Sequence, residues 1–117
     1  MGESILTSIK KLLGITEEYT QFDTDIIIHI NSVFMILRQL GVGPEDGFAI
    51  EDSNAVWTDY IPNATLAKLE AVKTYVYLKV KLLFDPPLSG TAVAAAERLI
   101  TEFEWRINAI ADTIDNE

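Results

Sequence analysis

The single histidine is the first side chain to consider for catalysis or metal binding. His29 is the only imidazole in 117 residues, so a histidine-paired nucleophile or a multi-histidine metal site is excluded unless subunits share it. Asp25 lies four positions earlier, where two side chains share one helix face and can form a local ion pair. We therefore interpret His29 as a residue at the edge of the core rather than as a ligand or catalytic base.

The carboxylates and the glycine-containing loop do not form a recognisable site either. Glu97, Glu102 and Glu104 lack the Glu-x-x-His pairing of two-metal helical bundles, and we interpret them as a solvated face. The loop GVGPEDG at 41–47 has neither the spacing nor the following lysine of a phosphate-binding loop. Because cysteine is also absent, we expect no catalytic residue, no cofactor and no bound metal, and hence a protein that is not an enzyme.

Composition and charge narrow the possible partners. Hydrophobic residues make up 49% and charged residues 23% of the chain, which is typical of one folded domain over residues 1–117. The formal net charge of -9 repels polyanions, so tight binding of nucleic acid is disfavoured. The longest apolar stretches are too short to cross a bilayer, and no signal peptide is evident, so we expect a soluble protein without a membrane partner. The lack of cysteine fits synthesis in a reducing cytoplasm.

Apolar periodicity and capping residues predict an all-α fold, a small bundle of four helices. Gly14 is placed to end the first helix, Asp23 to cap the second, and Asn63 or Thr65 to start the third. The helices are predicted at 3–13, 24–40, 66–84 and from Ser89 to about Asp112, with a flexible end beyond it.

Residues 48–60 break the helical period between the second and third helices. Phe48 and Ile50 alternate with other residues, EDSN has turn chemistry, and Val56 and Trp57 resume an apolar run. This pattern predicts a short β-hairpin.

Three apolar residues of the second helix fall outside its core stripe. Ile28, Met35 and Ile36 lie among polar residues when the helix is turned at 100° per residue. The third helix has apolar residues on two sides, which predicts a central position in the bundle. Either another chain contacts the three surplus residues, or the N-terminal helix or the hairpin folds over some of them.

A tryptophan lies on the polar face of the last helix. Trp105 projects among Arg98, Thr101 and Glu102, opposite the predicted inward stripe, which consists of Ala96, Leu99, Ile100, Phe103, Ile107 and Ile110. Its ring either lies over basic side-chain stems of its own chain or anchors a subunit or partner contact, where Trp and Arg are enriched. Together with Ile28, Met35 and Ile36, it suggests contacts between copies of the chain.

Several segments in order resemble a known family. They are FDTDIIIHINSVFMILRQLGVGP, AVWTDYI, LEAVKTYVYLKVKLLFDPP and the final helix ERLITEFEWRINAIAD. The chain resembles the head-tail connector family of tailed double-stranded-DNA bacteriophages and prophages, also called adaptor, head-completion or DNA-packaging proteins. The resemblance covers nearly the whole chain and rests on a pattern rather than on a catalytic motif.

This resemblance implies a structural subunit of the virion neck, made in the bacterial host cytoplasm. Such subunits form a ring, twelvefold by the resemblance, under the portal after DNA packaging. The ring extends the DNA channel and docks the stopper or tail. In such families the last helix and the tail after it engage the portal and neighbouring subunits, which gives Trp105, Arg98 and Glu102 a candidate role.

Two other classes of protein fit less well. An acidic helical inhibitor that mimics DNA would need its carboxylates arrayed on one surface, whereas here they are scattered over every predicted helix. A transcriptional regulator would need a basic recognition helix, and the lysines of the third helix are interleaved with core residues.

In a connector, acidic channel walls would let DNA pass without holding it.

Overall fold

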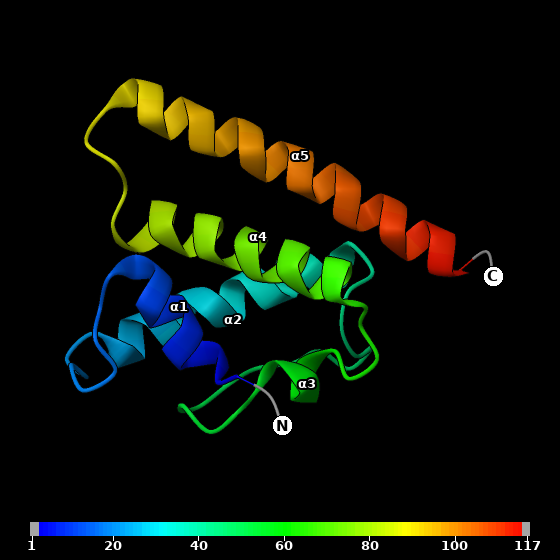
Figure 1. The fold of residues 1–117 in the computed structure, drawn as a ribbon, viewed down its shortest axis with the longest axis horizontal. Coiled ribbons are helices and arrows are strands. Elements are labelled where there is room, and N and C mark those ends of the chain that lie inside the picture. Colours follow the sequence, from blue (N-terminus) through cyan, green and yellow to red (C-terminus); the bar gives the residue numbers. More distant parts are fainter. Residues whose placement is uncertain (1–2, 116–117) are drawn as a thin grey trace.

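The computed structural model describes residues 3–115, and within this range the side chains as far as Ala109. This part of the chain folds into five helices and no strand, so the predicted all-α class is confirmed. The helices are α1 (Ile5–Leu13), α2 (Asp23–Gln39), α3 (Trp57–Tyr60), α4 (Leu66–Phe84) and α5 (Gly90–Asp115). Figure 1 shows α4 in the middle, with α1 and α2 on one side and α5 on the other.

Local capping signals set several helix ends, but the predicted Asp23 cap is wrong, because Phe22 precedes α2 without a side-chain cap bond and Asp23 is the first residue of the helix. The Ser4 hydroxyl accepts a hydrogen bond from the Thr7 amide at 3.2 Å and begins α1. Gly14 follows α1 with a φ of 84°, the left-handed cap predicted for it. The Thr65 and Ser89 hydroxyls cap α4 and α5 in the same way.

The last helix is longer than predicted. It continues to Asp115 instead of ending near Asp112. The flexible end was predicted from residue 112 onward. The side chains of this segment lie outside the described residues, and so do residues 116–117 as a whole.

The predicted β-hairpin at 48–60 is wrong. No two segments within this range pair with each other in the described structure. Instead, the side-chain amide of Asn31 on α2 binds the backbone of Ile50 twice, accepting from its N–H at 2.8 Å and donating to its carbonyl at 3.0 Å. The alternation of Phe48 and Ile50 thus reflects an extended segment held by a side chain, where a strand partner was expected.

The second half of this segment pairs with the start of the chain. Ser4 and Val56 form an isolated antiparallel bridge, and the Ile5 amide donates to the Ala55 carbonyl at 3.0 Å. The chain then turns into α3, where an Asp59 carboxylate oxygen accepts from the Val56 amide at 3.0 Å. This pairing links residues about fifty positions apart, which local sequence patterns do not report.

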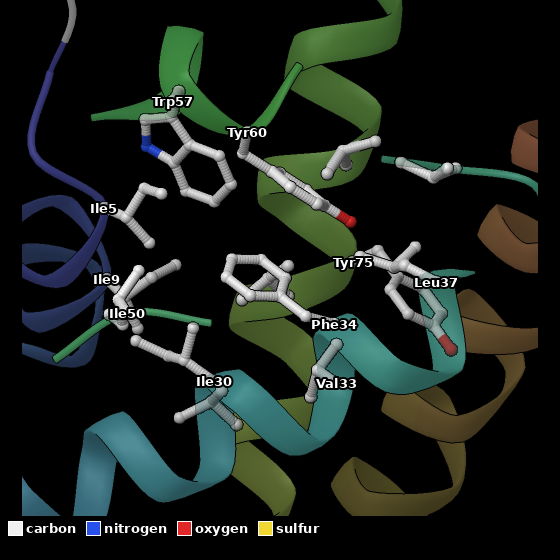
Figure 2. Packing of buried hydrophobic residues seen from close by; sticks show 14 of the residues in the cluster. Ile5, Ile9, Ile30, Val33, Phe34, Leu37, Ile50, Trp57, Tyr60 and Tyr75 are labelled. Atoms are coloured by element: carbon white, nitrogen blue, oxygen red, sulfur yellow. The ribbon is translucent and has the colours of Figure 1, made fainter. Parts of the chain in front are cut away.

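The core lies where α1, α2, α3 and α4 meet (Figure 2). The rings of Phe34 and Tyr60 have centroids 4.3 Å apart, and the Trp57 indole donates to the Ser8 hydroxyl at 2.9 Å. Five residues of the predicted stripe of α2 are buried, and the sixth, Leu40, is half-buried; the five are Ile26, Ile30, Val33, Phe34 and Leu37. The predicted central position of α4 is confirmed, since it packs against α1, α2 and α5.

One charged residue is buried at the junction of α1 and α2. The Lys10 side chain is 2% exposed, and its ammonium lies 2.8 Å from an Asp23 carboxylate oxygen and 3.1 Å from the Glu17 carbonyl. A buried ammonium is tolerated only when its charge and its donors are matched in this way. Lys10 therefore fastens the loop between α1 and α2 to the domain.

Candidate assembly surfaces

The outer face of α2 consists of Ile28, Ser32 and Met35. Ile28 is 56% and Met35 69% exposed, so neither is covered by the N-terminal helix or by the 48–60 segment. They are seven positions apart and share one helix face. Ile36, predicted to be surplus as well, is half-buried against the core. The predicted apolar surplus on α2 is thus two residues, because the third turns far enough toward the domain to be partly covered.

The outer face of α5 consists of Ala94, Arg98, Thr101, Glu102 and Trp105. The Trp105 side chain is 73% exposed, so it does not lie covered by basic side-chain stems of its own chain. Glu102 forms an ion pair with Arg106 one turn later, whereas the Arg98 side chain has no hydrogen-bond or ion-pair partner among the described residues. Residues of this face border an open hollow of about 650 Å³.

The opposite face of α5 attaches the helix to α4. Ile100 and Ile107 are buried there, and Phe103 packs partly against the core. The Tyr75 hydroxyl on α4 donates to a Glu104 carboxylate oxygen at 2.8 Å. Burial, together with this carboxylate, raises the pKa of Tyr75. Leu99, predicted to point inward, is 46% exposed, so the attached stripe is narrower than predicted.

The two outer faces belong to separate surfaces. Both α2 and α5 pack against α4. Figure 1 shows α2 and α5 on opposite sides of α4. The six residues singled out from the sequence therefore lie on two helices that α4 separates.

A cavity that sequence reasoning missed lies beside the start of α4. We call it the Tyr60 pocket, and its volume is about 500 Å³. A Cβ atom at Gly43 would lie 2.6 Å from the Tyr60 ring, so only glycine lets the chain pass this close. Its lining residues come from the 43–44 turn, the end of α3, the chain between α3 and α4, and the first turn of α4, namely Gly43, Pro44, Asp59, Tyr60, Ile61, Pro62, Asn63, Ala64, Thr65 and Lys68.

Tyr60 itself is almost fully buried, with 2% of its surface exposed. Its hydroxyl has no hydrogen-bond partner in the described part of the chain. Burial raises the pKa of this hydroxyl well above its ordinary value. The sequence signals related to this pocket are Gly43 and Pro44 in one segment and Pro62 beside Tyr60 in the other. These two segments come together only in the folded chain.

The single histidine packs against an aromatic ring. His29 is half-buried, and its ring packs edge-on against Phe84 with centroids 6.4 Å apart. Within residues 3–115 no ion pair joins it to Asp25, and no group of three acidic, histidine or cysteine side chains is placed to hold a metal ion.

Charges are distributed unevenly over the surface. Between Glu45 and Asp59 the chain has five acidic residues and no basic one, and all five are exposed. On α4, Lys73 pairs with Glu3 at 2.8 Å, and this hydrogen bond raises the pKa of Lys73. Lys68 at the edge of the Tyr60 pocket has no side-chain partner among the described residues.

None of the described helices is both long and apolar enough for a membrane span.

Comparison with known proteins identifies the family of this fold. No curated protein and no solved structure matches the chain. The family model described as "Phage connector protein" matches residues 5–113, from the first residue of α1 almost to the end of α5. The chain therefore belongs to the phage connector protein family, a family of structural proteins of the head-tail connection.

Proposed function

We propose that this chain forms a ring of identical subunits beneath the portal, twelvefold in the virion, which extends the DNA channel and docks the stopper or tail. The exposed Trp105 carries the proposal. A large apolar side chain that its own chain leaves 73% exposed, on a helix attached by its opposite face, has the character of an interface anchor.

The outer face of α5 is suited to a protein partner. Arg98 and Trp105 are of the residue types that contribute most to binding energy at interfaces. Charged groups around the anchor select the partner and its orientation. We assign this face to contacts with the portal or with a neighbouring subunit.

The outer face of α2 is the second contact surface in this proposal. Ile28 and Met35 expose apolar surface on a helix that is otherwise covered on its inner side. An unbranched methionine adapts to differently shaped partners. A ring subunit that also docks the portal, stopper or tail needs more than its contacts with neighbouring subunits, and the outer face of α2 supplies such an additional contact surface.

The acidic surface fits a channel through which DNA passes. A net charge of -9 gives the wall the same sign as the DNA, so the polymer is not held. The exposed acidic run between Glu45 and Asp59 is the segment that we expect to face the lumen. A lumen lined by lysines in an electron-microscopy map of the particle would contradict this assignment.

The test is light scattering after size-exclusion chromatography, with the protein alone and then mixed with its cognate portal. We expect a ring-sized species in at least one sample, and we expect Trp105→Ala to reduce it. Tyr19→Ala is the matched control, because Tyr19 is an exposed aromatic residue outside both surfaces. A monomer in both samples would overturn the proposal.

A further inference from the structure

We propose that Trp105 of one copy inserts into the Tyr60 pocket of the next copy. The inference rests on the proposed ring and names the two surfaces through which neighbouring subunits join. Trp105 does not line the pocket of its own chain, so its indole remains available to another copy.

The size and lining of the pocket suit an aromatic side chain. A volume of about 500 Å³ lies within the range of roughly 300–1,000 Å³ in which proteins enclose ligands. Pro44, Pro62 and Ala64 supply apolar walls, and the Tyr60 ring adds an aromatic surface. A tryptophan that fills such a pocket loses contact with water over most of its ring, which is how interface anchors stabilise a complex.

The charges around the two surfaces are complementary. The pocket edge holds Lys68, whose ammonium is unpaired in the described structure, and the exposed carboxylate of Asp59. On the outer face of α5, Arg98 is unpaired, and Glu102 is exposed one turn before Trp105, where it pairs with Arg106. Each surface thus carries an unpaired cation and an exposed carboxylate, so in a contact between copies Lys68 can meet Glu102 and Arg98 can meet Asp59, which an uncharged peptide would not offer.

The contact is of the head-to-tail type. The pocket lies at the start of α4, whereas Trp105 lies on the outward face of α5, so the two partners contribute different surfaces. Such heterologous contacts repeat from copy to copy and close into a ring when the rotation between copies permits.

The chain contains no cysteine, so an introduced cysteine is the only thiol with which a cross-linker can react. One variant carries Asn63→Cys at the pocket, and the other carries Asn108→Cys, one turn after Trp105; both positions are exposed. The two variants are mixed with and without the portal and treated with a short bis-maleimide. We expect the mixed dimer to dominate and to fall about tenfold when Trp105→Ala is added to the Asn108→Cys chain. Thr24→Cys in place of Asn63→Cys is the matched control, because it is exposed on α2.

A complementation experiment checks the direction of the contact. Trp105→Ala leaves a chain with a free pocket and no anchor, and Ala64→Trp fills the pocket while the anchor remains. We expect neither variant to assemble alone and their mixture to stop at a dimer, because a single intact contact is left. Circular dichroism of each variant establishes that it is folded, and Ala64→Leu replaces Ala64→Trp if the larger side chain unfolds the domain.

The outcomes separate this inference from the proposed function. A ring that forms while the mixed cross-link is absent, or insensitive to Trp105→Ala, overturns the inference and leaves the ring in place. Cross-links between two copies of the same variant at equal yield would also overturn it, since they indicate a symmetric contact. If no assembly forms with or without the portal, both proposals fail.

Discussion

Residues 41–61 and helix α5 are attached to the domain in opposite ways. The first segment is irregular apart from the four-residue helix α3, yet it places Val42, Ile50, Trp57, Tyr60 and Ile61 in the core. The second is a regular helix of 26 residues, but among its described side chains only Ile100 and Ile107 are buried. Regular secondary structure therefore does not measure how firmly a segment belongs to this fold. Integration depends on buried side chains and on satisfied backbone groups, and these are concentrated in the irregular segment.

The largest effect on stability is expected at Trp57, the most deeply integrated residue of the irregular segment. Trp57→Ala removes a side chain that is 2% exposed and leaves a cavity, so we expect unfolding free energy to fall by about 3–5 kcal/mol. Urea unfolding followed by circular dichroism measures this change. Trp57→Phe, which keeps a ring but loses the bond to Ser8, should cost less; equal costs would mean that the hydrogen bond, not the packing, matters most.

Among the contacts of residues 41–61, the next largest effect is expected at Asn31, which holds this segment from α2. Asn31→Ala leaves the N–H and carbonyl of the largely buried Ile50 without their partner, at a cost of about 2 kcal/mol. Ser32→Ala is the neighbouring control, because its exposed hydroxyl binds only the Ile28 carbonyl. A similar loss for both variants would contradict the role given to the Asn31 amide.

Two tyrosines test the difference between residues 41–61 and α5, since Tyr60 lies in the first and Tyr75 is bonded to the second. Tyr75→Phe removes the hydrogen bond to Glu104 that fastens α5, so we expect a loss of about 1.5 kcal/mol. Tyr60→Phe removes a buried hydroxyl without a partner among the described residues, so we expect no loss or a small gain. Thermal unfolding of the two variants, side by side, measures the difference. A larger loss at Tyr60 would indicate a partner for its hydroxyl.

The same tyrosines predict a pH dependence. The pKa of each is raised in the folded chain, chiefly by burial, so the folded state keeps protons that the unfolded state loses. Stability should be unaffected by these groups below the ordinary tyrosine pKa of about 10 and should fall as the pH rises above it. Urea midpoints at alkaline pH measure the slope, which should be shallower in the Tyr60→Phe/Tyr75→Phe double variant. An unchanged slope in that variant would contradict the assignment.

The smallest effect on stability is expected at Trp105. Because its ring is 73% exposed, Trp105→Ala should change unfolding free energy by less than about 0.5 kcal/mol. Ile107 on the inner face is 1% exposed, and Ile107→Ala should cost about 3 kcal/mol. Denaturant unfolding of both variants compares the two faces of one helix. A large loss for Trp105→Ala would place its ring in the domain and remove its role as an anchor.

Local signals in the sequence predicted what local physics determines. Gly14, Thr65 and Ser89 act on the turn next to them, so the helix ends they mark were predicted within a few residues. Helix periodicity placed Trp105 and Met35 outside the core stripes but left open whether another part of the chain covers them, and the structure leaves both exposed.

Features that depend on distant segments were not predicted. The Asn31 amide replaces a strand partner for Ile50, which made an extended segment look like half of a hairpin. The Tyr60 pocket needs the 43–44 turn beside the start of α4, and nothing in either segment alone indicates their proximity. Ile36 is half-buried because of tertiary packing that a helical wheel does not contain.

The pairing of Ser4 with Val56 also has a consequence for synthesis on the ribosome. The Trp57 indole binds Ser8 across 49 positions of sequence, so α1 cannot be completed as a packed element until residues beyond Trp57 have left the exit tunnel. Until then, its core side chains Ile5, Leu6 and Ile9 lack their cover, and nascent chains are most prone to associate wrongly at this stage. Of the described helices, α1 is thus the first to emerge and among the last to complete its packing.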